Sequence, residues 1–314
     1  MHSTSNFKEG IFMHDIIIVG AGPAGLTAAL YSLRADKSVL VIEKESFGGQ
    51  ITYSPKVENY PGFMQMSGNE FAEKLLDQVT EHGADIELCE VTGIVDNGST
   101  KTVVTDAGSF EGKAVIIATG CKHRHLGVEG EDELIGEGIS FCAVCDGAFY
   151  AGRKVGVVGG GNSALVEAMM LSEVCSEVVI IQNLAMLTGE AKMVRALEQK
   201  ANVSMLFNTV VTGFEKTDVL SGVKLRNTES GEDFTLDVDG LFVAIGHAPE
   251  NDAFENVTEL NDYGYIVADE NCLTKTPGVF VAGDCRTKAI RQITTATADG
   301  AVSALAACRY IDSI

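Results

Sequence analysis

The chain has 314 residues, of which 46% are hydrophobic and 21% charged, and its formal net charge is −21. This composition is typical of globular proteins and excludes a disordered chain, and the length suggests two domains. The negative charge argues against binding to nucleic acid or to anionic membranes, because like charges repel. No apolar run is long enough to span a membrane, and residues 1–13 lack the apolar core of a signal peptide.

Cysteine usage points to a reducing compartment. The eight cysteines are scattered along the chain apart from one Cys-x-x-Cys pair, so they do not form the framework of a secreted disulfide-rich protein. We therefore expect a cytoplasmic protein. Residues 1–12 are expected to be a disordered extension.

A first nucleotide-binding motif lies near the N-terminus. The buried-strand pattern of residues 15–19 leads directly into Gly20-Ala21-Gly22-Pro23-Ala24-Gly25, which opens a helical run. The first glycine of such a motif makes a tight turn, the second lets a pyrophosphate approach, and the third lets the helix pack closely on the strand. The next strand, residues 38–42, ends at Glu43, where an acid can meet a ribose 2′-hydroxyl. The motif predicts an adenosine cofactor without a 2′-phosphate, such as FAD or NAD.

The following segment supplies turns and a small set of strands. Residues 47–50 and 57–62 are rich in turn-forming residues. The spacing predicts an amphipathic helix over residues 70–82 and a small antiparallel set of strands over 85–112. Residues 114–120 then form a second buried strand that runs into a Thr-Gly turn. A crossing between domains is expected after it.

A pair of cysteines separated by two residues comes next. Cys142 and Cys145 are followed at once by Asp146. Two thiols at this spacing can close a small disulfide, and a neighbouring charge can tune their pKa values, which favours a two-electron redox centre. The same spacing is half of a zinc site, and His123 and His125 lie upstream, but the two halves do not have the separation of known zinc motifs.

The nucleotide-binding pattern then repeats. A strand over residues 154–158 leads into Gly159-Gly160-Gly161-Asn162-Ser163-Ala164, and a helix over 165–172 follows. The next strand, 177–181, ends at Gln182-Asn183-Leu184, which holds neither the usual acid nor an arginine for a 2′-phosphate. Two dinucleotide folds imply two nucleotides, or one nucleotide and the remains of a site.

The C-terminal part contains two further strand ends. Residues 240–249 form a strand and a turn, and residues 278–284 form a strand that ends at Gly283 and Asp284. An Asp at such a place often binds a ribitol or phosphate hydroxyl, although it can equally be a helix N-cap. Arg291 and Gln292 precede a small-residue helix expected over residues 295–309.

In this combination the motifs between Met13 and Ile314 resemble those of the low-molecular-weight thioredoxin reductases. The resemblance implies an α/β fold with two Rossmann-like three-layer nucleotide-binding domains, the second inserted in the first. The FAD-binding domain would comprise residues 13–122 and 250–314, and the inserted NAD(P)-binding-like domain residues 123–249, with hinges near 121–124 and 247–250. Members of the family are homodimers that act on a thioredoxin-like protein.

The resemblance also implies roles for individual residues. Cys145 would exchange electrons with the flavin, Cys142 would attack the disulfide of the partner protein, and Asp146 would donate and accept protons. The residues expected to bind FAD are Gly20, Gly22, Pro23, Ala24, Gly25, Glu43, Gly49, Gln50, Asn59, Ala118, Thr119, Gly120, Gly283, Asp284, Arg291, Gln292 and Ile293. Those expected to bind the second nucleotide are Gly159, Gly161, Asn162 and Ser163. No metal is expected.

The chain departs from the family at the second nucleotide site. NADPH-dependent members carry a His-Arg-Arg run and a further Arg after the second strand, whereas residues 182–188 of this chain include no cation. Val166 also replaces the first of two acids, although Glu167 is retained. We therefore expect NADH rather than NADPH, with Gln182 or Asn183 accepting a hydrogen bond from the 2′-hydroxyl. Ferredoxin or another flavin is an alternative donor, and a flavin dithiol oxidase that uses oxygen is an alternative enzyme.

Overall fold

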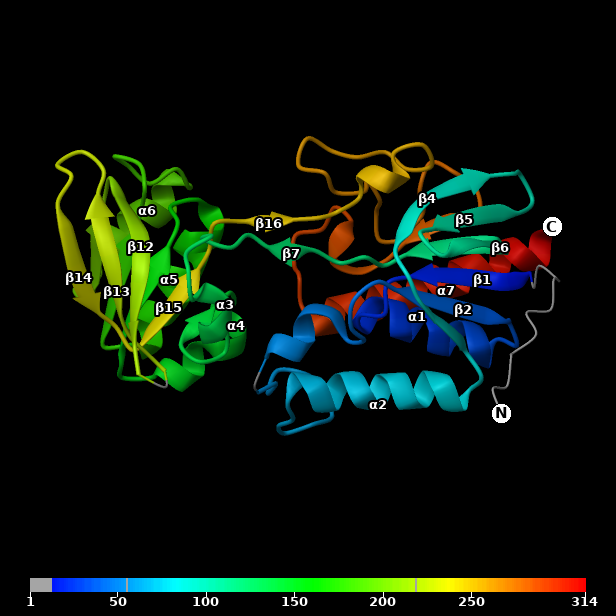
Figure 1. Ribbon diagram of the computed structural model, residues 1–314, viewed down its shortest axis with the longest axis horizontal. Helices are drawn as coiled ribbons and strands as arrows, with labels where there is room; N and C mark the ends of the chain where they lie inside the picture. The colour runs from blue at the N-terminus through cyan, green and yellow to red at the C-terminus, as the bar shows by residue number, and fades with distance from the viewer. Residues whose placement is uncertain (1–12, 55, 218) are drawn as a thin grey trace, which may run out of the picture.

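The computed structural model describes residues 13–54, 56–217 and 219–314, and it consists of two domains side by side (Figure 1). The expectation for residues 1–12 lies outside these described residues. Two short strands join the domains, β7 (Lys122–His123) and β16 (His247–Ala248), which pair antiparallel. The smaller domain lies in sequence between these two strands, and we call it the inserted domain. The expected α/β fold, with one Rossmann-like domain inserted in another, is confirmed.

The larger domain is built on a sheet with the strand order β3-β2-β1-β6-β5-β4. β17 also pairs with β6, along the second half of that strand and on the edge opposite β1. Val and Ile dominate the central strands, as expected for strands that are buried on both faces. The strands are β1 (His14–Val19), β2 (Val39–Glu43), β3 (Asp85–Leu88), β4 (Val91–Asp96), β5 (Lys101–Thr105), β6 (Gly108–Ile117) and β17 (Val279–Val281).

The expectation of a small antiparallel set over residues 85–112 is confirmed for β4, β5 and the first half of β6, but it is wrong in two respects. β3 pairs parallel with β2 and extends the main sheet. β6 is one long strand, whose first half pairs antiparallel with β5 and whose second half lies parallel between β1 and β17. Alternation of polar and apolar residues predicts a half-buried strand, but it does not distinguish parallel from antiparallel pairing.

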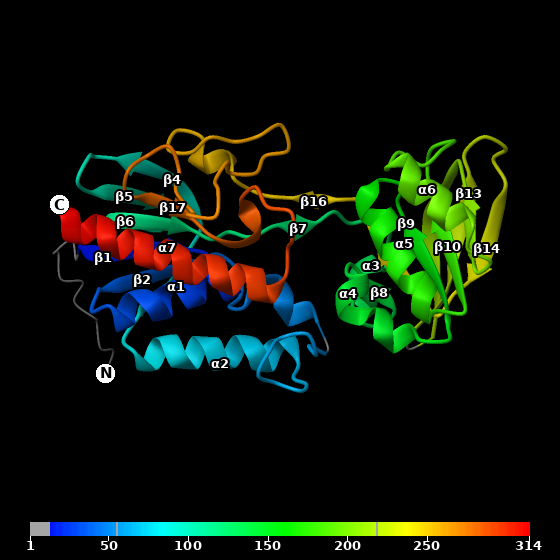
Figure 2. The ribbon, with the colours of Figure 1, turned by 180° about the vertical axis from the view of Figure 1, so that it is seen from behind.

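Helices cover one face of the parallel part of this sheet, and residues of β4, β5 and the irregular chain of residues 254–268 pack on the other. Alternate residues of β1, such as Ile16 and Ile18, pack with α1 (Pro23–Arg34) and α7 (Ile293–Ser313), whereas Ile17 packs on the opposite side with Ile94 and Phe254. Figure 2 shows α7 lying along the sheet, with α1 next to it and α2 (Gly68–Glu81) outside. The close approach of α7 to α1 needs Gly300, because a Cβ there would lie 2.3 Å from the Ala24 carbonyl oxygen.

The inserted domain repeats the three-layer plan. Its central sheet has the order β11-β10-β9-β15-β8, with α5 and α6 on one face and the antiparallel sheet β12-β13-β14 on the other. The strands are β8 (Ile139–Ser140), β9 (Lys154–Val158), β10 (Glu177–Ile181), β11 (Val203–Leu206), β12 (Thr209–Lys216), β13 (Leu220–Asn227), β14 (Asp233–Asp237) and β15 (Gly240–Val243), and the two helices are α5 (Asn162–Val174) and α6 (Ala191–Glu198).

Short helices occupy the connections around the interdomain space. α3 (Glu131–Leu134) and α4 (Ala143–Asp146) lie on the side of the inserted domain that faces the larger domain. The single-turn 3₁₀ helices are η1 (Gly49–Tyr53), η2 (Gly147–Tyr150), η3 (Asp252–Phe254) and η4 (Gly283–Cys285). Within the described ranges, no helix combines the length and the apolar character needed to cross a membrane.

Candidate functional site

The first glycine motif forms the turn expected of it. Gly20 has a φ of +106°, and a Cβ there would lie 2.4 Å from the Ala118 carbonyl oxygen, so only glycine fits. A Cβ at Gly25 would lie 1.9 Å from the Gly20 carbonyl oxygen, which places the start of α1 directly against the turn. Pro23 is the first residue of α1, and its N-cap Gly22 offers no side chain to the free N–H groups. This helix end is suited to an anionic phosphate.

Glu43 is fixed at the same turn. One oxygen of its carboxylate accepts a hydrogen bond from the Ala21 N–H at 2.8 Å, and the other accepts one from the Lys44 N–H at 2.8 Å. The carboxylate therefore lies beside the glycine turn, where an adenosine ribose meets a Rossmann domain.

Two more of the expected segments meet this turn, and a third meets the start of α7. A Cβ at Gly49 would lie 3.5 Å from the Gly22 Cα, and one at Gly283 would lie 2.8 Å from the Ala24 Cβ. The Asn59 amide donates a hydrogen bond to the Gln292 side chain at 3.2 Å, which brings the 57–62 loop to the start of α7 at Ile293.

The remaining expected residues border the same space. Thr119 donates a hydrogen bond to Asn251 Oδ1 at 3.1 Å, and no atom would come within 4 Å of a Cβ at Gly120. Gln50 is exposed at the start of η1. These residues thus form a cradle in front of α1 whose chemistry suits the expected FAD, because Gly120 leaves open space and the start of α1 has no side-chain cap.

Asp284 has the environment of a ligand-binding carboxyl. Its side chain is half-buried, its Oδ1 is buried without a hydrogen-bond partner among the described residues, and burial raises its pKa. Arg291 donates to the main-chain oxygen of Asp284 at 3.3 Å and packs 4.2 Å from the centroid of the Tyr265 ring. A buried carboxyl oxygen without a hydrogen-bond partner in the described chain suits a ligand hydroxyl, and Asp284 is not a helix N-cap, because it lies within η4.

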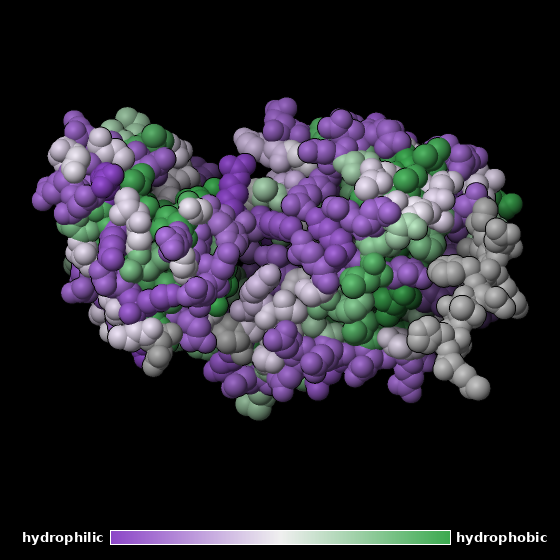
Figure 3. All heavy atoms as spheres, in the orientation of Figure 1, coloured by the Kyte–Doolittle hydropathy of each residue, from purple (hydrophilic) through white to green (hydrophobic). Residues whose placement is uncertain are grey.

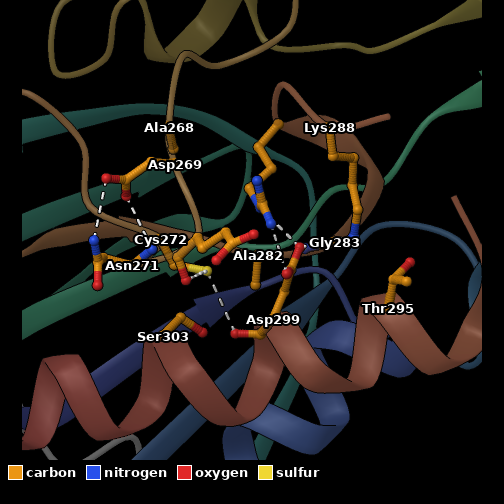
Figure 4. A network of polar contacts seen from close by, with 12 residues as sticks. Ala268, Asp269, Asn271, Cys272, Ala282, Gly283, Lys288, Thr295, Asp299 and Ser303 are labelled. Carbon is orange, nitrogen blue, oxygen red and sulfur yellow. Dashed lines mark hydrogen bonds and ion pairs between the residues drawn. The ribbon is translucent and has the colours of Figure 1, made fainter. Parts of the chain in front are cut away.

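A buried ionic network supports the Gly283-Asp284 turn, and sequence reasoning did not find it (Figure 4). Asp299 of α7 accepts two hydrogen bonds from the Arg286 guanidinium, each at 2.8 Å. It also accepts from Lys288 Nζ at 2.9 Å and from the Gly283 N–H at 3.0 Å. Asp299 therefore ties the turn to α7. No sequence motif indicated this network, because the partners of Asp299 lie 11 to 16 residues from it along the chain.

The two motif cysteines form a disulfide. Cys142 and Cys145 are bonded, with their Cα atoms 5.3 Å apart, at the start of α4, and both are half-buried. The other six cysteines are free and buried, as is usual for cysteines that pack as small apolar residues. Within the described part of the chain, no group of three or more His, Cys, Asp and Glu side chains could hold a metal ion. The His123 ring stacks on Phe141 at 4.7 Å.

Asp146 lies behind the disulfide. Ser140 Oγ donates a hydrogen bond to Asp146 Oδ2 at 2.6 Å and accepts one from the Cys142 N–H at 3.1 Å. Burial raises the pKa of Asp146, and the Ser140 hydrogen bond opposes that rise. Sequence reasoning found Asp146 but missed Ser140, because a single serine two residues before the pair carries no motif.

The second glycine turn is covered by the chain that follows β10. Thr188 and Gly189 donate their N–H groups to the Gly160 carbonyl oxygen at 2.7 and 3.0 Å. Asn162 Oδ1 accepts from the Glu190 N–H at 2.7 Å, while Ser163 is exposed at the helix start. Residues 182–190, which we call the cover segment, contain no Lys, Arg or His.

Gln182 begins the cover segment and lies on the glycine turn. Its side chain is buried, and its amide nitrogen donates to the Met186 carbonyl oxygen at 3.1 Å. A Cβ at Gly160 would lie 2.3 Å from that nitrogen. Gln182 thus lies against Gly160, the second residue of the second glycine motif, in the same way that Glu43 lies against Ala21 in the first motif.

The disulfide side of the inserted domain contacts the larger domain. Lys56 Nζ lies 5.0 Å from the centroid of the Phe149 ring of η2, and a Cβ at Gly136 would lie 3.6 Å from the Tyr53 carbonyl oxygen. Figure 3 shows a hollow between the two domains, bordered on this face mainly by hydrophilic residues. The disulfide therefore lies on an element that packs beside the larger domain.

Comparison with known proteins of similar sequence and fold identifies the family. The Pyridine nucleotide-disulphide oxidoreductase family matches residues 14–300. The thioredoxin reductase of Listeria monocytogenes is 40% identical over 96% of this chain and 95% of that protein. The crystal structure of thioredoxin reductase from Streptococcus pyogenes has a TM-score of 0.93 at 36% identity, over 97% of this chain and 100% of that one.

A second solved structure matches less closely in space. Lactococcus lactis thioredoxin reductase in its "FR conformation" has a TM-score of 0.67 at 33% identity, over 96% of this chain and 100% of that one. The two identities are similar, so sequence divergence alone does not account for the lower score. The chain is an oxidoreductase that belongs to the pyridine nucleotide-disulphide oxidoreductases and, among them, to the low-molecular-weight thioredoxin reductases.

Proposed function

We propose that this enzyme takes electrons from NADH in preference to NADPH and delivers them to a thioredoxin-like protein. FAD supplies the chemistry that accepts two electrons from a pyridine nucleotide and passes them to a disulfide. The observation that carries the choice of NADH is the cover segment, which lies on the second glycine turn and contains no cation.

FAD would be held by the cradle in front of α1. The N–H groups at the start of α1 would hold the pyrophosphate, and Glu43 would accept a hydrogen bond from the ribose. The unpartnered Oδ1 of Asp284 would accept from a flavin-side hydroxyl, and Gly49, Asn59 and Thr119 would border the cofactor. Gln50, Ala118, Gly120, Arg291, Gln292 and Ile293 complete this proposed set.

The Cys142–Cys145 disulfide and Asp146 would carry out the redox reaction. Cys145 receives the electrons and Cys142 attacks the disulfide of the partner protein, in the order that the family resemblance implies. Asp146 supplies and receives the protons of the two sulfurs. Its burial supports this role, because a carboxyl with a raised pKa can hold a proton closer to neutral pH.

The preference for NADH follows from charge and from hydrogen bonding. A 2′-phosphate needs cations, and each charge-assisted hydrogen bond to it is worth about 1.5–3 kcal/mol. The cover segment offers none, whereas the Gln182 side chain lies on Gly160 with an amide oxygen that can accept from a 2′-hydroxyl. Gly159, Gly161, Asn162 and Ser163 would carry the pyrophosphate side of the nucleotide.

The domain boundaries form part of the proposal. We assign residues 13–122 and 250–314 to the FAD-binding domain and 123–249 to the inserted domain, with hinges in the β7 and β16 segments. Rotation about these hinges would move the disulfide between the flavin and the partner protein. The lower TM-score against the FR conformation supports such a rotation. The active enzyme would be a homodimer, as the family resemblance implies.

The test is steady-state reduction of thioredoxin with each nucleotide. We expect kcat/KM with NADH to exceed that with NADPH by at least about tenfold, the effect of a single lost phosphate contact. Cys145→Ser should abolish thioredoxin reduction with either nucleotide. Equal or greater efficiency with NADPH would overturn the proposed donor.

Two other results would replace the proposal by its alternatives. If the enzyme reduces thioredoxin with electrons from reduced ferredoxin but with neither nucleotide, the second glycine turn does not bind the electron donor. Rapid oxygen consumption with a small dithiol, and no thioredoxin reduction, would identify a flavin dithiol oxidase.

A further inference from the structure

A second half-buried acid, Glu167, lies on the helix that packs against the redox segment. Glu167 is in the second turn of α5, the helix that packs against α4. One turn further along, Leu171 touches the next residue of the redox segment, since a Cβ at Gly147 would lie 3.2 Å from Leu171 Cδ2. This packing directs the Glu167 face of α5 toward the element that carries the disulfide.

Both acids have an oxygen that the described residues leave without a hydrogen bond. Asp146 is held through Oδ2 by Ser140, while its Oδ1 is buried and unpartnered. Glu167 Oε2 is likewise buried and unpartnered among the residues that the structure describes. Unpaired buried carboxyl oxygens are costly, so each calls for a proton, a ligand or a function.

Charge links the two acids. Burial raises the pKa of Glu167 to about 8, and the nearby Asp146 carboxylate adds to the rise. From η2, the Tyr150 phenol also faces Asp146; burial raises its pKa, and the Asp146 charge adds to that rise. Two carboxyls that interact through their charges in a poorly solvated space do not both ionise easily, so they titrate as a pair.

We propose that Glu167 shares a proton with Asp146 and thereby acts as a positioning residue for the redox reaction of Cys142 and Cys145. This inference rests on the proposed function, in which Asp146 serves the sulfurs. Reduction breaks the S–S bond and places two electrons, supplied by the pyridine nucleotide, on the sulfurs. The shared proton moves to one sulfur, the other is left as a thiolate, and the acid pair regains its proton from water.

The test compares Glu167→Gln with Glu173→Gln. Glu173 lies on the same helix but is exposed, where it pairs with Lys200, so it controls for the loss of a carboxylate from α5. Each protein, with FAD bound, is reduced with dithiothreitol without oxygen. The rate of alkylation of the Cys142–Cys145 thiols by iodoacetamide is then followed against pH. This measurement needs neither a nucleotide nor thioredoxin.

The expected profiles differ above neutral pH. In the wild type, Glu167 loses its proton as the pH rises through about 8, and the added negative charge disfavours the thiolate. Glu167→Gln adds no such charge, so above about pH 8 its thiols should react faster than those of the wild type, by up to about tenfold where the pH is still below the thiol pKa values, the effect of about one unit in a thiol pKa. Glu173→Gln should follow the wild type, and Glu167→Asp should regain the acid transition.

Infrared difference spectra between oxidised and reduced enzyme give a second readout. The wild type should show a carbonyl band of a protonated carboxyl that changes on reduction, and Glu167→Gln should lose it. An unchanged alkylation profile in Glu167→Gln, or an equal change in Glu173→Gln, would overturn the inference. If the wild type fails to reduce thioredoxin but the alkylation profiles still differ, the proposed function fails and the shared proton stands.

Discussion

Asp299 is the residue whose replacement should damage the larger domain most clearly. Its carboxylate is 9% exposed, and the two cations that it binds, Arg286 and Lys288, are 8% and 6% exposed. Removing one charged partner from a buried ionic group costs about 3–5 kcal/mol, because the opposite charge is left uncompensated. Asn can still accept one hydrogen bond, so we expect Asp299→Asn to destabilise the domain by about 3 kcal/mol, near the lower end of that range.

The pH dependence of this network has a definite sign. Burial alone would raise the pKa of Asp299, but the hydrogen bonds from Arg286 and Lys288 outweigh it and hold the pKa below its ordinary value. The stabilisation is therefore fully present above the unfolded-state pKa and is lost as the pH falls through the lower folded-state pKa. Asp299→Asn should remove this part of the acid sensitivity.

Urea unfolding followed by circular dichroism and by flavin fluorescence measures the effect. The flavin signal would report on the larger domain, because that domain is proposed to bind FAD. We expect the transition of the larger domain to move to lower urea, with early FAD release, while that of the inserted domain stays in place. Asp312→Asn, which alters an exposed carboxylate paired with Lys37, is the matched control. An unchanged flavin transition in Asp299→Asn would refute the reasoning.

Three further predictions test other parts of the site. The double variant Asn183→Arg, Leu184→Arg should raise kcat/KM for NADPH by about tenfold or more, since each arginine can add a charge-assisted hydrogen bond to the 2′-phosphate. Unimproved kinetics with NADPH would show that the cover segment does not determine which nucleotide is used. Glu43→Gln should weaken FAD retention during dialysis, because the amide oxygen is a weaker acceptor than the carboxylate. Brief alkylation of the native enzyme should label two more thiols after reduction than before, namely Cys142 and Cys145. The six free thiols should react slowly because they are buried, and burial raises the pKa of Cys121 to about 12. Rapid labelling of additional cysteines would contradict this burial.

The sequence predicted the parts of this protein that depend on local pattern. Each glycine motif needs backbone conformations and close approaches that only glycine permits, as at Gly20 and Gly25, so the turns could be located without a structure. The Cys-x-x-Cys spacing likewise anticipated the disulfide between Cys142 and Cys145. Helix starts were accurate to about two or three residues, which is typical for boundaries read from periodicity.

The parts that were missed depend on contacts across the fold. Asp299 meets its partners only because α7 lies beside the Gly283 turn, and Ser140 meets Asp146 only because α4 turns back over β8. Glu167 was noticed as a retained acid, but its burial beside Asp146 follows from the packing of two helices. The parallel pairing of β3 was missed because strand direction is set by the partner strand.

The most direct test of the central claim is an anaerobic titration of the purified enzyme with NADH and, separately, with NADPH. Loss of the oxidised flavin absorbance reports electron entry, and thiol counting reports reduction of the Cys142–Cys145 disulfide. We predict that NADH bleaches the flavin and opens the disulfide at near-stoichiometric amounts, while NADPH does so much more weakly. Bleaching by reduced ferredoxin alone, with neither nucleotide effective, would contradict the account.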